Sequence, residues 1–381
     1  MKVGVIGAGS MGSGIAQIAA SFDCEVFIFD SSKEVCDIAL KKLNKILSRL
    51  VEKGRIDSNK KSSILKNITV VNNIDEFHNT DLVIEAIIEN VELKENIFKI
   101  LSKKVSSDCI LASNTSSLSI TNLASNCVNP SRFLGIHFFN PAPLMPLVEI
   151  IPALQTSNNI VETAQKLISS WGKYPVIAKD TPGFIVNRIA RPFYGEALRI
   201  FEEGIADFTT IDNSMKQIGR FKMGPFELMD FIGNDVNYAV TKSVFKSFYY
   251  DPRYKPSFTQ KMYAEAKWLG RKTNKGYYDY SSVTVNDGNS IVDQVLGNYV
   301  FERILVMLIN EAVDALYMGI ASEKDIETAM RKGVNYPKGL IEWGREKTFK
   351  WCVNLMDDLY GIYHEDRYRC SPLMRKWAKE I

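Results

Sequence analysis

The sequence predicts an α/β region built on a mostly parallel sheet, followed by a region made of helices alone. Up to about residue 180, short apolar runs rich in strand-forming residues alternate with longer segments of helical spacing. Strands that alternate with helices are typical of a parallel sheet with helices on both faces. Beyond residue 180 the alternation stops and helical spacing dominates. The length of 381 residues fits two or three domains.

Eight apolar runs predict the strands of the first region. They lie at residues 2–6, 25–29, 68–72, 81–87, 109–113, 133–138, 147–151 and 174–178. Because these runs are largely continuous in apolar residues, we expect the strands to be buried on both faces. Helices are predicted at residues 13–22, 32–53, 91–105 and 159–171. The pattern therefore predicts one domain over residues 1–180.

The helical region is predicted to begin with one long amphipathic helix, residues 184–203. Thr181 and Pro182 are suited to be its N-cap and first residue, because threonine caps helices well and proline fits the first turn. Pro192 predicts a kink inside this helix. Gly204 predicts its end.

The helical region also repeats itself at an offset of 115 residues. The matched pairs are Arg188 with Arg303, Glu196 with Glu311, Ala197 with Ala312, Gly204–Ala206 with Gly319–Ala321, Ile211 with Ile326, Met215 with Met330, Gly224 with Gly339 and Glu227 with Glu342. A single register across so many positions that are not apolar predicts two copies of one helical unit. We expect them at residues 181–285 and 291–381, with the polar, turn-rich segment Ser281–Ser290 at their junction. Only the short run 276–280 has the alternation of a strand.

Composition argues against several classes of protein. The chain is 46% hydrophobic and 24% charged, with a net charge of +3, which gives no support for a nucleic-acid or membrane partner. No apolar run approaches the ~20 residues that span a bilayer. Six cysteines show no metal-binding spacing and there are three histidines, so we expect no metal site. With no secretory signal expected either, a cytoplasmic location and reduced cysteines are the simplest interpretation.

A glycine-rich turn after the first predicted strand indicates a nucleotide site. Its six residues are Gly7, Ala8, Gly9, Ser10, Met11 and Gly12. Gly7 permits the tight turn, Gly9 lets the backbone approach a pyrophosphate, and Gly12 packs the next helix on the strand. Asp30 ends the second strand, where it would bind ribose hydroxyls and repel a 2′-phosphate, which favours NAD over NADP. A flavin dinucleotide uses the same pattern, and a turn that binds nothing is the plain alternative.

His137 and Glu149 form the candidate catalytic pair. His137 ends a predicted strand, at the edge of a parallel sheet where ligands bind, and a histidine suits removal of a hydroxyl proton at neutral pH. Glu149 lies inside the apolar run Leu147–Ile151, and a carboxylate there needs a partner. The alternatives are a histidine satisfied within the core, and a glutamate paired with another cation or facing outward.

Two further polar residues belong to this candidate site. Ser116 lies in the segment Ser113–Ser117, which follows another strand end, so its hydroxyl would face the same crevice. Asn187 lies one turn into the first long helix, in the run Gly183–Arg188. A solvated helix residue is the plain alternative for this asparagine.

At these residues the chain resembles the L-3-hydroxyacyl-CoA dehydrogenases. The motifs GAGSMG (7–12), SNTSS (113–117), HFFNP (137–141), LVE (147–149), DTPGFIVNR (180–188) and MGPFEL (223–228) stand in the order of that family. The resemblance runs from residue 1 to about 280, and the tail resembles a second copy of the family's C-terminal domain. It implies a Rossmann-type NAD-binding domain followed by two helical domains that are 6-phosphogluconate-dehydrogenase-like.

The resemblance implies a role for each site residue. His137 takes the proton of the 3-hydroxyl, and Glu149 orients and stabilises it. Ser116 and Asn187 bind the reacting oxygen or the neighbouring acyl group, and hydride leaves C3 for NAD. Further cofactor contacts implied by the family are Glu89, Lys94, Ser116, Asn140 and Lys272. Without the resemblance, a surface ion pair is the simpler interpretation of Glu89 with Lys94.

Coenzyme A carries phosphates, so we expect a basic surface near the substrate. The second predicted helix offers five cations, Lys41, Lys42, Lys45, Arg49 and Lys53. Arg49 and Lys53 are our candidates for substrate binding, although such a charge run is usually only a solvated face.

The second helical copy departs from the first at the site. Glu302 stands where Asn187 stands in the first copy, and no second glycine-rich turn follows, so we expect one active site per chain. The family pairs its helical domains across a two-fold axis. The second copy is therefore expected to fold back on the first as a pseudo-dimer within the chain, with ordinary homodimerisation as the alternative.

The function that these observations favour is NAD-dependent, reversible oxidation of L-3-hydroxyacyl-CoA to 3-oxoacyl-CoA in fatty-acid or related acyl-CoA metabolism. 3-Hydroxybutyryl-CoA and acetoacetyl-CoA are the expected pair. The alternatives are a dehydrogenase of a free hydroxy acid such as L-gulonate, and a cofactor-binding protein without turnover, as among lens crystallins.

Overall fold

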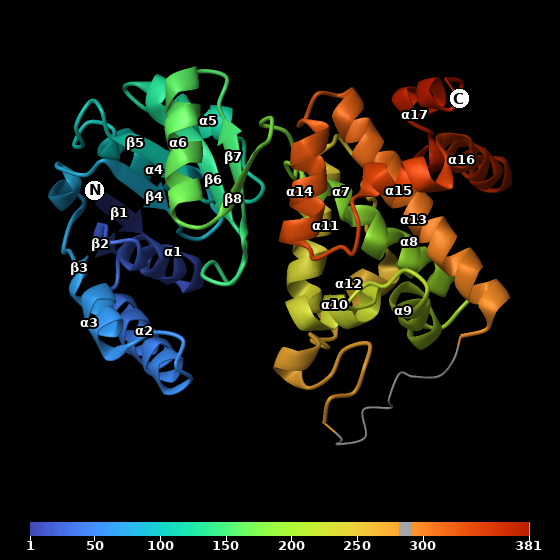
Figure 1. Cartoon of the computed structure of the whole chain (residues 1–381), viewed down its shortest axis with the longest axis horizontal. Helices are drawn as coiled ribbons and strands as arrows, with labels where there is room; N and C mark the ends of the chain where they lie inside the picture. The colour runs from blue at the N-terminus through green and yellow to red at the C-terminus, as the bar shows by residue number, and fades with distance from the viewer. Residues whose placement is uncertain (282–291, 381) are drawn as a thin grey trace. The chain divides into compact units, whose positions relative to one another are not determined.

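The computed structural model describes residues 1–281 and 292–380 (Figure 1). Its contacts divide the chain into two compact units, Met1–Thr181 and Pro182–Ile381. The first unit contains all the strands of the described chain, and both helical copies lie in the second. The junction predicted at Ser281–Ser290 lies outside the described residues, apart from Ser281.

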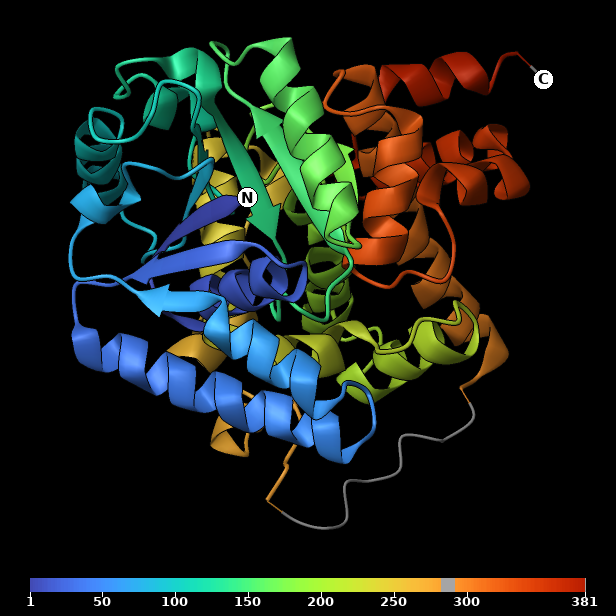
Figure 2. The ribbon, with the colours of Figure 1, turned by 60° about the vertical axis from the view of Figure 1, so that its left-hand side comes forward.

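The first unit contains one eight-stranded sheet, ordered β3-β2-β1-β4-β5-β6-β7-β8 (Figure 2). The strands are β1 Lys2–Ile6, β2 Glu25–Phe29, β3 Ile68–Val70, β4 Leu82–Glu85, β5 Ile110–Ser113, β6 Phe133–Phe138, β7 Leu147–Pro152 and β8 Tyr174–Ile177. All pairs are parallel except β6 with β7. The eight predicted strands and the mostly parallel sheet are confirmed.

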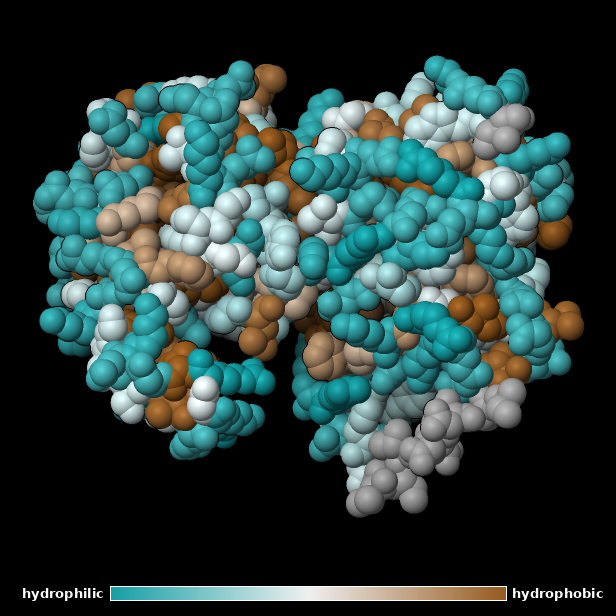
Figure 3. All heavy atoms as spheres, in the orientation of Figure 1, coloured by the Kyte–Doolittle hydropathy of each residue, from teal (hydrophilic) through white to brown (hydrophobic). Residues whose placement is uncertain are grey.

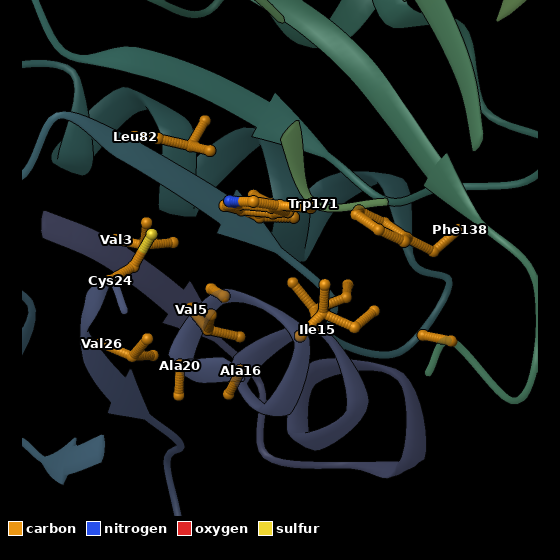
Figure 4. Close-up of a cluster of buried hydrophobic side chains, with 14 of the residues drawn as sticks. Val3, Val5, Ile15, Ala16, Ala20, Cys24, Val26, Leu82, Phe138 and Trp171 are labelled. Atoms are coloured by element: carbon orange, nitrogen blue, oxygen red, sulfur yellow. The ribbon is translucent and has the colours of Figure 1, made fainter. Parts of the chain in front are cut away.

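Helices cover both faces of this sheet. They are α1 Ser10–Ser21, α2 Lys33–Glu52, α3 Ser58–Lys66, α4 Val91–Leu101, α5 Ile120–Ala124 and α6 Asn158–Ser170, with short 3-10 turns η1 Ile74–Phe77 and η2 Pro130–Arg132. Apolar residues of α1, α2 and α6 share one core with β1, β2 and β4. Figure 4 shows part of this core, with Trp171 among its side chains. On the opposite face, Phe98 of α4 packs edge-on against Phe133 at 4.6 Å between ring centres. Successive side chains of a strand point to opposite faces of the sheet, so the residues of β6 that do not belong to the first core face α4 and α5.

The second unit consists of helices. They are α7 Val186–Ile189, α8 Arg191–Glu202, α9 Phe208–Gln217, α10 Pro225–Ile232, α11 Asn234–Ser247, η3 Pro252–Tyr254, α12 Phe258–Glu265, η4 Arg271–Thr273, α13 Gln294–Tyr317, α14 Glu323–Gly333, α15 Leu340–Lys347, α16 Phe349–Tyr363, η5 Asp366–Tyr368 and α17 Pro372–Trp377. The alternating run at 276–280 forms no strand, and Lys275 and Asp279 form only an isolated antiparallel bridge.

The long helix predicted at residues 184–203 is divided in two. Gly183 and Phe184 have positive φ angles of 74° and 46°, which a right-handed helix cannot contain, so the predicted capping by Thr181 and Pro182 is wrong. The one-turn helix α7 ends at Ile189, and Pro192 lies in the first turn of α8. The proline thus starts a new helix where the sequence predicted a kink, since proline fits a first turn better than a helix interior.

The two helical copies match element by element. The helices α9, α10 and α11 correspond in order and offset to α14, α15 and α16, and η3 with α12 corresponds to η5 with α17. Even a buried cap is repeated. Asp212 accepts from the backbone N–H of Phe226 at 2.9 Å, and Glu327 accepts from that of Ile341 at 2.7 Å. The predicted duplication is therefore confirmed.

The copies pack on each other through reciprocal ion pairs. Arg188 of the first copy donates to Glu311 of the second at 2.6 Å, and Arg303 of the second donates to Glu196 of the first at 2.7 Å. These are the residues matched at the offset of 115. In a two-fold interface, a residue of one copy contacts a second residue of the other copy, and the counterparts of these two residues make the same contact in reverse. The described packing within the second unit thus supports the pseudo-dimer.

Over the described ranges, no helix is long and apolar enough to cross a membrane. The face shown in Figure 3 is largely hydrophilic on both units, with hydrophobic residues scattered over it. All six cysteines are buried and are described as free thiols. Burial raises the pKa of Cys127 to about 12, which keeps this thiol in its unreactive protonated form.

The pseudo-dimer predicts the mass in solution. Because the second copy occupies the face that a twin subunit would use, we expect the full chain to sediment near its monomer mass of 43.0 kDa. A chain ending near residue 285 loses α13, so its buried arginine and glutamate lose their partners and it should become unstable or dimerise. A dimeric full chain whose shortened form is a stable monomer would contradict this prediction.

Candidate active site

The glycine-rich turn has the geometry that a dinucleotide needs. Gly7 has φ +102°, and a Cβ at Gly12 would lie 1.8 Å from the carbonyl oxygen of Gly7, so neither position tolerates a side chain. At Gly9 a Cβ would meet nothing within 4 Å, which leaves open space beside the N-terminus of α1. Helix α1 begins at Ser10 without a side-chain cap. Its first N–H groups are thus suited to bind phosphate.

Asp30 lies directly beside this turn. One of its carboxylate oxygens accepts from the N–H of Ala8 at 2.8 Å, and the other accepts from the N–H of Ser32 at 3.2 Å. These bonds fix the carboxylate at the end of β2, next to the first turn of the nucleotide motif. Asp30 thus lies beside the glycine-rich turn, as predicted. Both hydrogen bonds that hold its carboxylate there come from backbone N–H groups.

His137 and Glu149 face each other across the antiparallel pair β6 and β7. They are direct partners in its register, and Nδ1 of His137 lies 2.7 Å from Oε2 of Glu149. Both side chains are buried, and the ring of Phe139 lies 4.5 Å from the imidazole. An antiparallel neighbour places the two side chains on the same face. The sheet therefore creates the pairing that the buried glutamate was expected to need.

Glu89 fastens the loop that carries Ser116. Its Oε1 accepts from the hydroxyls of Thr115 and Ser117, at 2.5 and 2.8 Å, and from the N–H of Ser116 at 3.3 Å. Burial alone would raise its pKa, but the ammonium of Lys94 and the two hydroxyls hold the pKa of Glu89 below its usual value. The stability from these bonds is present above the usual glutamate pKa and is lost as the pH falls through the lowered value.

Lys94 lies inside the fold rather than on its surface. Its side chain is 1% exposed, and its ammonium lies 2.5 Å from Glu85 and 3.4 Å from Glu89. Glu85 ends β4, is fully buried and also accepts from the hydroxyl of Ser113 at 2.7 Å. Glu89 and Lys94 do pair, but the interpretation of them as a surface pair is wrong for Lys94, which is buried, whereas the side chain of Glu89 is 38% exposed. The buried partner of Lys94 is Glu85, a residue that the sequence analysis did not identify.

A second residue missed in the sequence is Lys173, between α6 and β8. Its ammonium donates to the carbonyls of Ala142, Pro143 and Met145, at 2.7, 3.3 and 2.8 Å. These carbonyls belong to the loop that begins at Asn140, one of the expected cofactor contacts. Burial lowers the pKa of Lys173 to about 8. Lys173 is a single basic residue after an amphipathic helix and belongs to no motif, so the sequence gives no reason to select it.

The other predicted site residues belong to further elements of the two units. Arg49 and Lys53 are exposed on and just after α2. Asn187 and Lys272 belong to the second unit, where Asn187 is half-buried on α7 and the ammonium of Lys272 lies 2.5 Å from Asp235. Asn140 lies 3.5 Å from the hydroxyl of Ser10, through its side-chain oxygen.

Among residues 1–281 and 292–380, no group of three or more histidine, cysteine, aspartate or glutamate side chains is placed to hold a metal ion.

Comparisons with known proteins agree with the geometry. The model of the 3-hydroxyacyl-CoA dehydrogenase NAD-binding domain matches residues 2–181, and that of the family's C-terminal domain matches residues 183–280 and again 299–380. The 3-hydroxyadipyl-CoA dehydrogenase of Escherichia coli is 36% identical, over 99% of this chain and 97% of its own length. The probable 3-hydroxybutyryl-CoA dehydrogenase of Deinococcus radiodurans is 42% identical over 74% of this chain and 100% of its own.

A solved structure extends the match over the whole fold. The 3-hydroxybutyryl-CoA dehydrogenase of Escherichia coli superposes with a TM-score of 0.94 at 34% identity, over 100% of this chain and 98% of that one. Because both domain models match in order and the second matches twice, the chain belongs to the 3-hydroxyacyl-CoA dehydrogenase family and is an oxidoreductase that acts on CH–OH groups with NAD.

Proposed function

We propose that the chain interconverts L-3-hydroxyacyl-CoA and 3-oxoacyl-CoA at one site per chain. The buried pair of His137 and Glu149 carries this proposal. It stands at the end of β6, next to the strand end that carries Ser113. A buried imidazole oriented by a carboxylate is a suitable acceptor for the proton of a secondary alcohol.

The residues of the nucleotide motif fit NAD. The open space at Gly9, the close approach at Gly12 and the carboxylate of Asp30 would receive the pyrophosphate and the adenosine ribose. When bound, NAD supplies the acceptor for the hydride that leaves C3. Asp30 would exclude the 2′-phosphate of NADP by charge repulsion.

His137 would accept the proton of the 3-hydroxyl group. Because its Nδ1 is directed at Glu149, the proton of the 3-hydroxyl would be accepted at Nε2. The charge that forms on the imidazole is stabilised by the buried carboxylate. Ser116, whose loop is fixed by Glu89, and Asn187 of the second unit would hydrogen-bond the reacting oxygen or the acyl group.

The acyl chain is the finer part of the proposal. We expect 3-hydroxybutyryl-CoA to be a substrate, and the full-length relative that acts on 3-hydroxyadipyl-CoA makes a six-carbon dicarboxylic acyl chain the second candidate. Arg49 and Lys53 of the exposed basic face are the candidates for contact with the phosphates of coenzyme A.

Oxidation of NADH tests the substrate class. We expect NADH oxidation with acetoacetyl-CoA and none with free acetoacetate, because the proposal requires the coenzyme A part of the substrate. L-gulonate is already an alcohol, so it is tested in the opposite direction, where we expect no reduction of NAD. Measuring 3-oxoadipyl-CoA in parallel ranks the two acyl chains by kcat/KM. Preferred turnover of a free acid would overturn the proposal, and NADH binding with no turnover of any of these compounds would favour the cofactor-binding alternative.

The cofactor preference tests Asp30. We expect the enzyme to use NADH well and NADPH poorly, and Asp30→Ala to relax the preference because it removes the repelling charge. Asp37→Ala is the matched control, since Asp37 is an exposed acid on α2 and its loss removes the same charge. Steady-state kinetics with both cofactors measure the ratio. Equal use of the two cofactors by the unaltered enzyme would contradict the assignment.

The catalytic pair is tested by His137→Gln and Glu149→Gln. We expect turnover to fall by ~10²–10⁴-fold, the usual effect of losing a general base, with little change in NADH affinity measured by fluorescence. His78→Gln is the control, because His78 is exposed in the same unit. A folded variant of either pair residue with near-full turnover would remove that residue from the mechanism.

A further inference from the structure

We propose that the second helical copy takes part in catalysis through Arg188: Glu311 and Asp314 of α13 fix the turn of helix that carries Asn187. The second copy thereby supplies positioning residues to a site to which it contributes no reacting group. This inference rests on the proposed function, because it assumes that Asn187 binds the reacting group.

Helix α7 cannot hold its own position. It has four residues, Val186–Ile189, and a single turn is far below the length at which a helix is stable by itself. The residues before it, Gly183 and Phe184, have positive φ, and α8 starts a separate helix after Ala190. The orientation of Asn187 therefore depends on what this turn packs against. Its neighbours include α11 of the first copy and α13 and α14 of the second.

Arg188 is the side chain that ties this turn to the second copy. Its Nε donates to Glu311 at 2.6 Å, and one of its terminal nitrogens donates to Asp314 at 3.1 Å. The side chain is 3% exposed, and its guanidinium lies 5.3 Å from the ring centre of Phe248. A buried guanidinium with two carboxylate partners has little freedom, so the adjacent Asn187 is held with it.

The carboxylates that hold Arg188 are themselves held. Glu311 also accepts from the hydroxyl of Tyr254 at 2.5 Å, and Asp314 accepts from Arg253 at 2.9 Å. Burial alone would raise the pKa of Glu311, but Arg188 and Arg253 hold that pKa below its usual value, so the carboxylate stays charged. The anchor of α7 is thus a rigid, charged group that belongs to the second copy.

The duplication repeats this arginine–glutamate contact at Arg303, which does not lie beside a candidate site residue. Arg303 donates to Glu196 at 2.7 Å and to Glu203 at 2.8 Å, and Tyr368 donates to Glu196 as Tyr254 does to Glu311. Arg303, however, lies in the interior of the 24-residue helix α13, which needs no anchor to stay helical.

The residue before Arg303 also differs. It is Glu302, the counterpart of Asn187, and it accepts from Lys347 at 2.8 Å on a partly exposed surface. Met307 stands where Pro192 divides the first copy, so α13 continues where α7 ends. The two arginines therefore make matched contacts, and only one of them lies beside a candidate site residue.

This pseudo-symmetry supplies the experiment. Glu311→Gln removes one of the two carboxylate partners of Arg188 and Glu196→Gln removes one of those of Arg303, and each arginine keeps its second carboxylate. Each variant also loses a longer contact to one further arginine, Arg253 for Glu311 and Arg199 for Glu196. We expect a comparable decrease in Tm for the two variants. We expect Glu311→Gln to lower kcat by about 10- to 100-fold, in the range that a small displacement of a site residue causes, while Glu196→Gln retains the kcat of the unaltered enzyme. Equal values of kcat for the two variants would overturn the inference.

Combination with Asn187→Ala separates the inference from the proposed function. If Glu311 acts through Asn187, the double variant Glu311→Gln/Asn187→Ala should have the kcat of Asn187→Ala alone, because there is nothing left to position. Multiplying losses would instead mean that Glu311 acts on the fold in general and would refute the inference. Should Asn187→Ala alone leave kcat unchanged, the role proposed for Asn187 fails first.

A milder pair guards against variants that do not fold. Asp314→Asn weakens the second contact of Arg188, and Glu203→Gln weakens that of Arg303. Both acids are more exposed than the glutamates, so the variants should be stable. We expect a smaller loss of kcat, about severalfold, for Asp314→Asn alone. An equal kcat for this pair, with Tm unchanged, would overturn the inference as well.

Discussion

A carboxylate removed from water must find a partner inside the fold, and this requirement shapes both units of the chain. In the first unit, Glu149 meets His137 across two antiparallel strands, and Glu85 draws Lys94 inward from the start of α4. In the second unit, the two arginines matched by the repeat each take a glutamate of the other copy. The pairs that the chain buries thus define the candidate catalytic base, the loop of Ser116 and the packing of the two copies.

Much of the fold could be predicted because period and spacing are local properties. The eight strands, the mostly parallel sheet and the duplicated helices all follow from patterns along the chain. The division between α7 and α8 could not, because it depends on the left-handed conformation of Phe184, a residue whose type favours no such turn. The pairing of His137 with Glu149 could be anticipated, because a glutamate in an apolar strand needs a cationic or hydrogen-bonding partner when it is buried.

Other contacts were beyond the sequence because they join segments by tertiary packing alone. Lys173 clamps a loop about thirty residues before it, and nothing in its neighbourhood marks it as different from other surface lysines. The repeat matched Arg188 with Arg303 and Glu196 with Glu311, but matching positions show a shared fold and do not show which residue meets which. The reciprocal pairing is visible only when the copies are seen packed together.

The asymmetry between the copies also explains how a duplicated domain can serve one site. Breaking a buried ion pair by removing one partner costs about 3–5 kcal/mol, so both copies must retain their arginine and glutamate for the interface to persist. No such requirement applies to the residue before the arginine, which is Asn187 in one copy and Glu302 in the other. Packing therefore requires the arginine and the glutamate in both copies, while the role proposed for Asn187 would constrain only the copy whose helix is divided. The undivided helix α13 is long and continuous, which makes it the firmer support for the one-turn helix beside it.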